Sequence, residues 1–390
     1  MRIGFDAKRA AQNRTGLGNY SRFVLRILSE KFPSEEYHLF IPKRSRTPFL
    51  HEIPTIRRLV MHFPHTWPWR RLSAVWRIWG MTADIKDGGM DIYHGLSNEL
   101  PLNIRRAGCK SIVTIHDLIF RHTPEYYKPI DRWIYDYKFR RACKKADHVI
   151  AVSKYTKQEI MRYYGTPENK ITVVYQGCDP IFGRPISQEI LDDVRKRYGL
   201  PDKYVLFVGR IEERKNLMLV AKAIACITSQ GKNTGYGNTA EEIKVVAVGK
   251  PTKYLGRIKA YLAANGISDR FSFHHNVKYA DLPAFYRMAA VFAYPSRIEG
   301  FGIPLLEALT AGVPAIGCTG SCLEEAGGPH SIYTDPDDPH AMATAIAGIW
   351  SDSNLAREMS EKGYEYIRNF TDDRLAECLM DVYKNLRNGC

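Results

Sequence analysis

Tyr204-Val-Leu-Phe-Val-Gly209-Arg210 decides the fold of this chain, together with Lys215-Asn216-Leu217 shortly after it. A short apolar run that ends in glycine predicts a buried β-strand, and the second segment is expected to open a helix. Similar apolar runs alternate with helical patterns along the chain, which indicates parallel sheets covered by helices on both faces. Strands are predicted at 1–6, 37–42, 91–94, 110–116, 147–152, 171–175, 203–209, 243–249, 291–295 and 313–317.

The length of 390 residues favours two domains, because a single hydrophobic core rarely grows so large. The Gly- and Pro-containing segment 176–185 breaks the alternation and is the expected linker. We predict an α/β protein with two Rossmann-like domains, 1–180 and 181–371, whose parallel sheets face each other across a cleft. A last helical segment, 372–390, is expected to pack back on the first domain. Residues 230–241, rich in Gly, Asn and Thr, are expected to form an exposed loop.

The composition is that of a soluble globular protein, with 45% apolar and 25% charged residues. We find no apolar run of about 18 residues that could span a membrane and no signal peptide, so a cytoplasmic location is expected. The eight cysteines are scattered, which favours reduced thiols. Asp335-Pro-Asp337-Asp338 is interpreted as a turn with helix-capping acids, and no metal site is predicted.

Arg297-Ile-Glu299-Gly-Phe-Gly-Ile-Pro-Leu-Leu-Glu307 places two carboxylates eight positions apart. Glu299 lies in a glycine-flanked turn, and Glu307 lies about one turn into a helix that is otherwise apolar. A buried carboxylate is costly without partners, so Glu307 needs hydrogen-bond donors, and sugar hydroxyls are good candidates. Gly300 and Gly302 let backbone amides approach a ligand, and the N–H groups at the helix start favour an anion. This combination suits a nucleotide-sugar.

Two further segments carry groups that suit phosphate. Arg210 and Lys215 follow the strand that ends at Gly209, and two cations there can neutralise a leaving group without a metal. Gly16-Leu-Gly18 precedes an amphipathic helix, as in many anion sites. Ser21 stands where a complete dinucleotide fingerprint has a glycine, which disfavours a nicotinamide oxidoreductase.

Two other strand ends carry histidines. His116 follows an apolar strand and is expected to face the cleft, although a structural pairing with Asp117 is the alternative. His94 and Asn98 stand at a similar strand end and are candidate acceptor-side residues.

These segments together resemble the retaining glycosyltransferases of the GT-B fold, family 4 in particular. The two glutamates match the family's E-x7-E motif, and 203–217 matches its "VGR…KN" segment. The resemblance covers most of the chain but is absent over 42–80. It implies that Glu307 binds the ribose hydroxyls and that Glu299, with the amides of Gly300, Phe301 and Gly302, holds the hexose. It also implies that Arg210 and Lys215 stabilise the leaving diphosphate and that Gly16 and Gly18 touch the donor phosphate. His116 would touch the transferred sugar, and the backbone around Asn276 would line the base pocket.

The sequence carries few signals for the identity of the sugar donor and of the acceptor. Overall similarity to mannosyltransferases of surface-polysaccharide assembly favours GDP-mannose as co-substrate, with a UDP-hexose as the alternative, and no other cofactor is expected. The expected acceptor is a glycan or a lipid-linked glycan. Because no nucleophilic carboxylate is obvious on the acceptor side, same-face attack is favoured for retention. A nucleotide-sugar epimerase of the same fold and a degenerate, non-catalytic nucleotide-sugar-binding protein are the alternative functions.

The net charge of +14 lies entirely in residues 1–180, because residues 181–390 are neutral overall. Four of the six tryptophans lie in the Arg-rich segment 42–80, and Trp69, Trp76 and Trp79 follow helical spacing. Tryptophan and arginine on one helix suit an anionic membrane surface, which would make the protein peripheral on the inner face of the membrane. The alternative is that the tryptophans enter the core while the arginines face water. We find no nucleic-acid recognition module.

Overall fold

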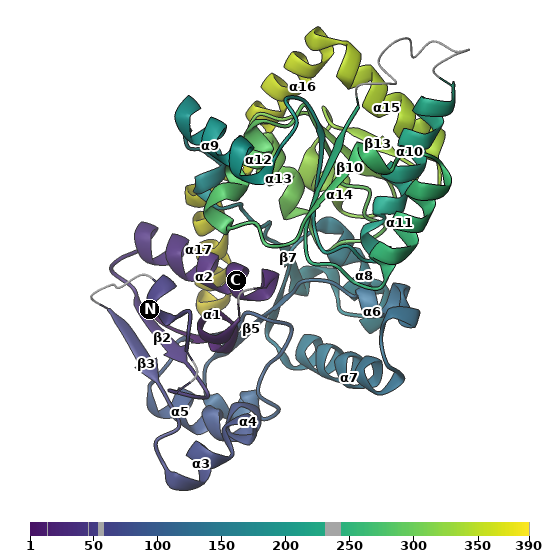
Figure 1. Ribbon diagram of the computed structural model, residues 1–390. Helices are drawn as coiled ribbons and strands as arrows, with labels where there is room; N and C mark the ends of the chain where they lie inside the picture. The colour runs from purple at the N-terminus through teal and green to yellow at the C-terminus, as the bar shows by residue number, and fades with distance from the viewer. Residues whose placement is uncertain (14, 46, 54–57, 231–242, 390) are drawn as a thin grey trace. The chain divides into compact units, whose positions relative to one another are not determined.

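The computed structural model describes residues 1–13, 15–45, 47–53, 58–230 and 243–389 (Figure 1). The loop expected at 230–241 lies, from residue 231 onward, outside the described residues. The chain divides into two compact units, with Met1–Gly177 and Phe370–Cys390 forming unit 1 and Cys178–Asn369 forming unit 2. The first boundary falls within the expected linker, and the second falls two residues before the expected end of the second domain.

Unit 1 contains a seven-stranded sheet in the order β3-β2-β1-β4-β5-β6-β7, and every pairing is parallel. The central strands carry fully buried apolar side chains, such as Ile3, Phe5 and Val113. The strands are β1 (Arg2–Asp6), β2 (Glu36–Phe40), β3 (Leu59–His62), β4 (Ile92–Gly95), β5 (Lys110–Ile115), β6 (His148–Ala151) and β7 (Ile171–Val173).

Helices surround this sheet, as expected for parallel strands that are buried on both faces. Ser153 caps the N-terminus of α8 by accepting a hydrogen bond from the Thr156 amide, so the cap predicted there is confirmed. The helices are α1 (Lys8–Gln12), α2 (Gly16–Lys31), η1 (Leu50–Glu52), α3 (Trp67–Arg71), α4 (Ser73–Val75), η2 (Trp76–Gly80), α5 (Met81–Asp87), η3 (Ile104–Ala107), α6 (Ile119–His122), η4 (Pro124–Tyr126), α7 (Pro129–Lys145), α8 (Lys154–Tyr164), η5 (Glu168–Lys170) and α17 (Asp372–Asn388).

Unit 2 contains a six-stranded sheet, also parallel throughout, in the order β10-β9-β8-β11-β12-β13. The strands are β8 (Val205–Val208), β9 (Val245–Val248), β10 (Phe271–His274), β11 (Val291–Ala293), β12 (Ala315–Cys318) and β13 (Ile332–Thr334). The helices are η6 (Pro180–Gly183), α9 (Gln188–Tyr198), η7 (Glu213–Lys215), α10 (Leu217–Gln230), α11 (Tyr254–Ala264), η9 (Ser268–Arg270), η10 (Tyr279–Asp281), α12 (Leu282–Arg287), α13 (Ile303–Thr310), α14 (Leu323–Gly327), α15 (Pro339–Ser351), α16 (Ser353–Tyr366) and η11 (Ile367–Phe370).

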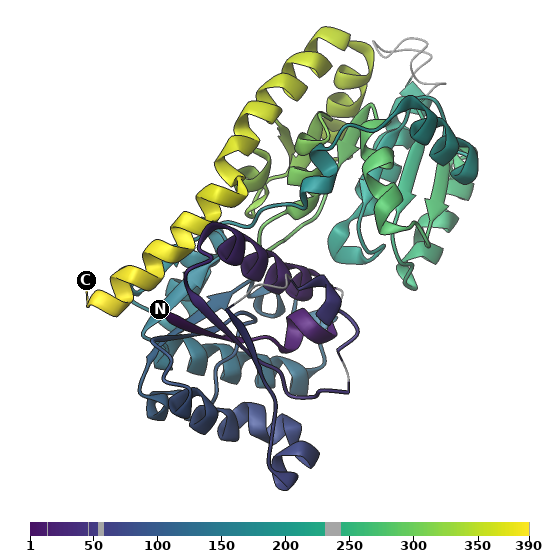
Figure 2. The same ribbon diagram turned by 90° about the vertical axis from the view of Figure 1, so that its left-hand side faces the viewer.

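The C-terminal helix α17 packs on α2 within unit 1 (Figure 2). Arg26 pairs with Asp372 at 2.7 Å, and Lys31 pairs with Asp373 at 3.0 Å. The Tyr383 hydroxyl contacts the buried His94 ring at 2.7 Å. The last seventeen-residue helix is therefore an integral part of the first unit.

Three strands, β3, β10 and β13, were not predicted from apolar runs. Each lies at an edge of its sheet, where only one neighbour pairs with it. Their burial patterns are correspondingly mixed, and β3 has no fully buried residue. An edge strand can lack a continuous apolar run, so the pattern that identified the central strands and β7 did not detect these three. The acidic turn before α15 is confirmed as helix-capping, because Asp338 accepts hydrogen bonds from the amides of His340 and Ala341.

The prediction that Trp69, Trp76 and Trp79 form one outward face is wrong. Trp76 is 1% exposed and donates from Nε1 to Asp84 Oδ2 at 2.6 Å, whereas Trp79 is 48% exposed. Trp69 is partly buried against the cluster that contains Trp76. The segment is broken after Arg71, and residues 76–80 form a π-helical turn. Because this turn is wider than an α-helical one, residues three apart no longer share a face.

Candidate active site

In each sheet the strand order reverses at one point, between β1 and β4 in unit 1 and between β8 and β11 in unit 2. Ligands in open parallel sheets bind outside the carboxyl ends of the strands at such a switch point. The predicted residues Arg210 and Lys215 follow β8, and Glu299 follows β11. The fold therefore gathers the central donor-side candidates at the switch point of unit 2.

Glycines allow the chain to pack closely beside β8. A Cβ atom on Gly249 would lie 1.8 Å from the Gly209 carbonyl oxygen, so no larger residue fits there. The Gly209 amide donates to Val248 and the Gly249 amide donates to His274, each at 2.9 Å. These bonds carry the strand pairing past the ends of β8 and β9 and fix the backbone that leads to Arg210.

Glu299 lies at the centre of a dense hydrogen-bond network. Its Oε1 atom accepts a hydrogen bond from Lys215 Nζ, lies 3.1 Å from Arg214 Nη1, and accepts hydrogen bonds from Ser296 Oγ at 2.5 Å and from Tyr294 Oη at 3.1 Å. The side chains of Glu299 and Lys215 are only 11% and 12% exposed. A carboxylate so placed needs these donors, because removal from water disfavours its charged form.

The pKa values reflect this competition. Burial alone would raise the pKa of Glu299, but Lys215 and Arg214 overcome it and bring the pKa to about 2. Burial lowers the pKa of Lys215 against the opposing effect of Glu299. We take the pair as charged, because Glu299 is held by two cations and Lys215 also donates to Tyr294 Oη at 2.6 Å. Arg214 stays charged, since Glu299 and Glu212 raise its pKa.

Glu307 has a different environment. It lies in α13, where its neighbours Leu306 and Ala308 are buried, and its Oε2 atom accepts a hydrogen bond from Tyr286 Oη at 2.7 Å. Burial raises the pKa of Glu307 to about 7, with the Tyr286 bond opposing this rise and the nearby Asp179 adding to it. A half-buried carboxylate with this pKa would gain from further donors.

Cys322 holds the backbone of the segment between the two glutamates in place. Cys322 Sγ donates to the carbonyl oxygens of Glu299 at 3.1 Å and Phe301 at 3.0 Å. Gly302 has a φ of +120°, a conformation open mainly to glycine, and precedes the first residue of α13. The Phe301 side chain is buried, so only backbone groups of this segment remain for the predicted contact with a sugar.

Two donor-side candidates are exposed. The Arg210 side chain is 66% exposed and lies 3.5 Å from Glu212. Asn276 is exposed in the segment after β10, where the preceding residue, His275, contacts the Gly249 carbonyl at 2.8 Å. Arg210 is thus free to reach a ligand, in contrast to Lys215.

At the carboxyl ends of the neighbouring strands β4 and β5 in unit 1, Asn98 and His116 lie together. Asn98 has a φ of +62°, and its Oδ1 atom accepts a hydrogen bond from the His116 amide at 2.8 Å. His116 Nε2 donates to the Leu96 carbonyl at 2.9 Å, which leaves Nδ1 as the acceptor nitrogen. Burial lowers the pKa of His116 to about 4, so its ring is neutral near pH 7. The His116 ring is thus held by the Leu96 carbonyl, and Asp117 accepts a hydrogen bond from the Ile119 amide at 3.2 Å.

His94 does not suit the acceptor-side role predicted for it. It is fully buried, and its ring nitrogens contact Tyr383 Oη at 2.7 Å and Thr114 Oγ1 at 2.8 Å. Burial lowers the pKa of His94 to about 3. His94 therefore links α17 to the sheet through its two hydrogen bonds. Asn98 positions the backbone of His116.

The glycine turn of unit 1 begins helix α2. Gly16 is exposed at the first helical position, and a Cβ atom on Gly18 would lie 1.9 Å from the Asn13 carbonyl oxygen. Two residues on, the Tyr20 ring packs edge-on against His116 with centroids 4.5 Å apart. The start of α2 therefore lies close to His116, on the same edge of the sheet.

Sequence reasoning missed three side chains of these networks. Arg214 was not predicted as a site residue, yet it contacts Glu299 and donates to the Ile298 carbonyl at 2.7 Å. Tyr286 and Tyr294, the hydroxyl partners of Glu307 and Glu299, lie on other segments of the chain. The one signal for Arg214 was its position next to Lys215 in the same turn.

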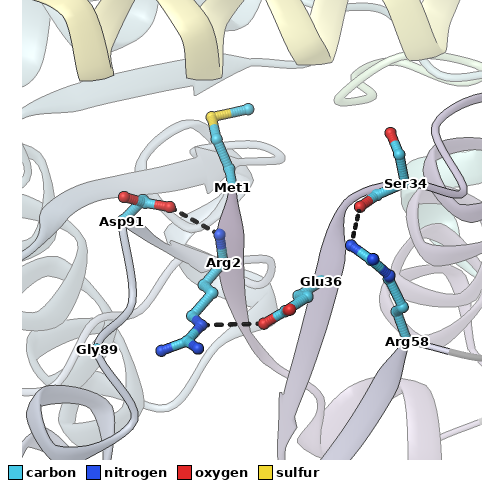
Figure 3. A pocket seen from close by; sticks show the side chains of 7 residues that line it. All are labelled: Met1, Arg2, Ser34, Glu36, Arg58, Gly89 and Asp91. Carbon is cyan, nitrogen blue, oxygen red and sulfur yellow. Dashed lines mark hydrogen bonds and ion pairs between the residues drawn. The ribbon is translucent and has the colours of Figure 1, made fainter.

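A cavity elsewhere in unit 1 lies at the opposite end of the strands (Figure 3). Its polar groups pair with each other, as Arg2 Nε does with Glu36 at 2.9 Å and Arg58 Nη1 with the Ser34 carbonyl at 2.7 Å. The lining residues, which include Met1, Gly89 and Asp91, belong to the amino ends of β1, β2, β3 and β4.

Within the described residues we find no cluster of His, Cys, Asp or Glu suited to a metal ion. No helix in the described ranges combines the length and apolar character that a membrane crossing needs.

Two family models match the chain. "Glycosyltransferase Family 4" matches residues 24–181, and "Glycosyl transferases group 1" matches residues 192–366. The O-antigen chain mannosyltransferase B of Escherichia coli is 25% identical, over 99% of this chain and 100% of that relative. The D-inositol 3-phosphate glycosyltransferase of Corynebacterium glutamicum is 27% identical, over 63% of this chain and 60% of its own.

Solved structures share the fold over the whole length. Sucrose-phosphate synthase from Thermosynechococcus elongatus aligns with a TM-score of 0.75 and 19% identity, over 100% of both chains. Anabaena HepE, solved in complex with UDP and glucose, aligns with a TM-score of 0.72 and 15% identity, over 99% of this chain and 100% of HepE. The α/β architecture with two parallel sheets is therefore the two-domain GT-B fold.

Proposed function

We propose that the chain, a glycosyltransferase of the family 4 type, transfers a hexose from a nucleotide-sugar to a glycan or lipid-linked glycan. This transfer would serve cell-surface polysaccharide synthesis. The transfer would retain the anomeric configuration and need no metal ion. The observation that carries this proposal is the unequal pair of carboxylates in unit 2, with Glu299 saturated by donors and Glu307 in need of them.

Glu307 is the proposed partner of the donor's ribose. A vicinal diol offers two O–H donors, and Glu307 has Tyr286 as its hydrogen-bonding partner at Oε2. Each new donor would favour the ionised carboxylate and lower its pKa from about 7. Binding of the ribose would thus release the proton that Glu307 holds at mildly acid pH.

The cations after β8 are the proposed site of the diphosphate. Arg210, Arg214 and Lys215 face the carboxylates of Glu212 and Glu299, which leaves one positive charge uncompensated. Exposed Arg210 can reach the diphosphate directly. Arg214 can keep Glu299 neutralised while Lys215 shares its donors with the phosphate. Preorganised cations stabilise the charge that develops on a leaving group, which is the role a metal ion fills elsewhere.

Within unit 2, the transferred sugar would lie against Glu299 and the backbone of Gly300–Gly302. Within unit 1, His116 is the proposed contact for a sugar hydroxyl. A neutral imidazole with Nδ1 as acceptor suits a sugar hydroxyl, whereas an imidazolium would compete for the phosphate. Same-face attack, with the leaving phosphate taking the acceptor's proton, accounts for retention without a nucleophilic carboxylate.

The donor is proposed as GDP-mannose because the relative that aligns over the full length is a mannosyltransferase. The solved structure of HepE with UDP and glucose keeps a UDP-hexose as the alternative. A lipid-linked acceptor would place the protein on the inner face of the membrane.

A donor panel tests the proposal. Thermal unfolding in the presence of GDP-mannose, UDP-glucose, UDP-galactose and the free nucleotides should show a stabilisation that grows with the logarithm of the ligand concentration. Product analysis by NMR with the stabilising donor should show a new glycosidic bond with the donor's anomeric configuration. Epimerised nucleotide-sugar as the product would favour the epimerase, and binding without turnover on any acceptor would favour a non-catalytic binding protein.

A chelator tests the metal-independent step. Activity should persist in excess EDTA, because Arg210, Arg214 and Lys215 supply the positive charge. Activity that is lost in EDTA and restored by magnesium or manganese would contradict this part of the proposal.

A further inference from the structure

Helix α1, which follows β1 in unit 1, carries buried polar groups that the protein itself does not satisfy. Within the described residues, Arg9 Nε and Gln12 Nε2 are buried and make no hydrogen bond. Buried N–H groups are nearly always paired, because their removal from water without an acceptor costs free energy. Two such groups on a helix of five residues therefore indicate a place built to meet an acceptor from a ligand.

The spacing of α1 gathers its polar side chains on one side. Ala10 and Ala11 are fully buried, and α1 packs on α2 (Figure 1). The side chains of Lys8, Arg9 and Gln12 are only partly buried. Residues three and four apart are neighbours on a helix, so Gln12 shares a face with both Lys8 and Arg9. We call these three residues the α1 site.

The α1 site lies at the switch point of the unit 1 sheet. There β1 and β4 are neighbours, and ligands of open parallel sheets bind outside the carboxyl ends of such strands. The hydroxyl of Ser97, two residues after β4, is also buried without a hydrogen bond among the described residues. Both strands that flank the switch point are thus followed by unsatisfied polar groups, as a ligand site requires.

The charge around the α1 site is positive. The nearby acids Asp6 and Glu99 both pair with Arg77, at 2.5 Å and 2.6 Å. Within the described residues, no ion pair joins a carboxylate to Lys8 or Arg9. Burial lowers the pKa of Lys8, and Arg77 and Arg9 lower it further, against the opposing effect of the two acids. An anion placed here would stabilise cations that now repel each other.

The α1 site adjoins the histidine proposed to contact a sugar. Burial is the main cause of the low pKa of His116, and the positive charge of Arg9 adds to it, so Arg9 lies close to His116. A ligand held by the α1 site would therefore present its sugar hydroxyls near His116.

We propose that the α1 site binds a phosphate group of the acceptor substrate. Its ammonium, guanidinium and amide groups are all donors, and phosphate oxygens can accept from each of them. The inference rests on the proposed transfer to a glycan and deepens it. A neutral glycan would need no cations here, whereas a sugar phosphate would. The donor's diphosphate has its own proposed site, at Arg210 and Lys215 of unit 2.

Calorimetric titration with sugar phosphates tests the proposal. Mannose 1-phosphate represents a glycan joined to a carrier through phosphate, mannose 6-phosphate represents a phosphorylated glycan, and methyl mannoside is the neutral analogue. At least one sugar phosphate should bind roughly tenfold more tightly than methyl mannoside, because only the phosphate makes charge-assisted hydrogen bonds. Lys8→Ala/Arg9→Ala should remove this advantage and leave the binding of GDP and UDP unchanged. Arg210→Ala should do the reverse.

Gln12→Glu separates a ligand site from a structural role. The new carboxylate would accept hydrogen bonds from Lys8 and Arg9, so the melting temperature should rise. The same negative charge would repel phosphate, so the affinity for the sugar phosphate should fall roughly tenfold. A merely structural role of the α1 site would not combine higher stability with lost binding.

The matched control is Arg105→Ala/Arg106→Ala, which removes an adjacent, exposed basic pair from η3, before β5. Its sugar-phosphate affinity should equal that of the unchanged protein. An equal loss in this control, or no preference of the unchanged protein for a sugar phosphate, would overturn the proposal. Weaker GDP and UDP binding by Lys8→Ala/Arg9→Ala would instead assign these cations to the donor. Sugar-phosphate binding through the α1 site without any binding of GDP or UDP would contradict the proposed function and support the site.

Discussion

The two switch points of the molecule differ in their electrostatics. At that of unit 2, Glu299 and Lys215 are charged members of a network in which Arg214 and Lys215 come from the turn after β8 and Tyr294 comes from the segment after β11. In unit 1, His94 of β4 and His116, which follows the neighbouring β5, are buried, and burial keeps both rings neutral near pH 7. Yet unit 1 carries the whole excess positive charge, and unit 2 carries none.

This difference shows that net charge and site chemistry are separate properties. Unit 1 keeps its charge on the surface, where it acts at a distance on anionic partners. Unit 2 concentrates opposite charges at one strand edge, where they are partly desolvated and hold a fixed geometry. We therefore expect changes at the unit 2 edge to affect the handling of a charged donor, and changes in unit 1 to affect stability and surface binding.

The largest effect is expected for Lys215→Ala, with Arg210→Ala as its matched partner. Both should reduce transfer on the order of a thousandfold, because each removes a preorganised charge from the diphosphate site. Lys215→Ala should also lower the free energy of unfolding by about 3 kcal/mol, since it leaves Glu299 buried with one cation fewer. Arg210→Ala should leave stability unchanged, because its side chain is exposed. Urea denaturation measures the change in the free energy of unfolding, and initial rates measure the change in transfer. Near-normal turnover in either variant would contradict the assignment of these cations to the donor's diphosphate.

The tryptophans of unit 1 give the next largest contrast. Trp76→Ala should lower the free energy of unfolding by about 3 kcal/mol, because it empties a buried site and removes the partner of Asp84. Trp79→Ala should change it by no more than about 0.5 kcal/mol, because the side chain is half exposed. Denaturation of the two variants side by side would separate core from surface in this segment, and equal losses would contradict the structure.

Acid should act on the two units in opposite directions. His94 and His116 have folded pKa values of about 3 and 4, below about 6.5 in an unfolded chain, so unit 1 loses stability as pH falls below about 6.5. Between pH 6.5 and 5 the loss should reach about 2 kcal/mol for each histidine. Glu307 has a folded pKa of about 7, above its usual value, so its contribution to unit 2 becomes more favourable as pH falls through 7.

Hydrogen exchange resolved along the chain can follow each unit separately. Protection in β4 and β5 should fall at pH 5.5 relative to pH 7.5, while protection in α13 should hold or rise. Glu307→Gln should abolish the second trend and spare the first. Equal loss in both units would show that the buried histidines do not distinguish them.

The smallest effect concerns donor binding. If ribose hydroxyls favour ionised Glu307, the dissociation constant of the donor should fall roughly fivefold between pH 6 and pH 7 and level off above the folded pKa of about 7. Calorimetric titration in buffers of different ionisation enthalpy should detect the proton released on binding. Tyr286→Phe should shift this dependence to higher pH, because it removes a donor that lowers the Glu307 pKa. A pH-independent dissociation constant would remove Glu307 from the donor site.

The sequence was most informative where local patterns suffice. Runs such as Val205–Val208 and the Ser153 cap depend on neighbours a few positions away, so the central strands and α8 were predicted correctly. The unequal environments of Glu299 and Glu307 were only partly predictable, because the need for donors follows from burial but the identity of the donors does not.

The sequence by itself determined a parallel α/β protein of the glycosyltransferase type, with Glu299 in the turn before a helix and Glu307 within that helix. Only the tertiary structure decided that Arg214 and Lys215 meet Glu299, that Tyr383 holds His94 across 289 positions of sequence, and that Trp76 enters the core while Trp79 remains outside. The physical reason is that periodicity specifies which face of an element is apolar, whereas the partner of a polar or aromatic side chain is set by distant segments that come together only when the sheets are assembled.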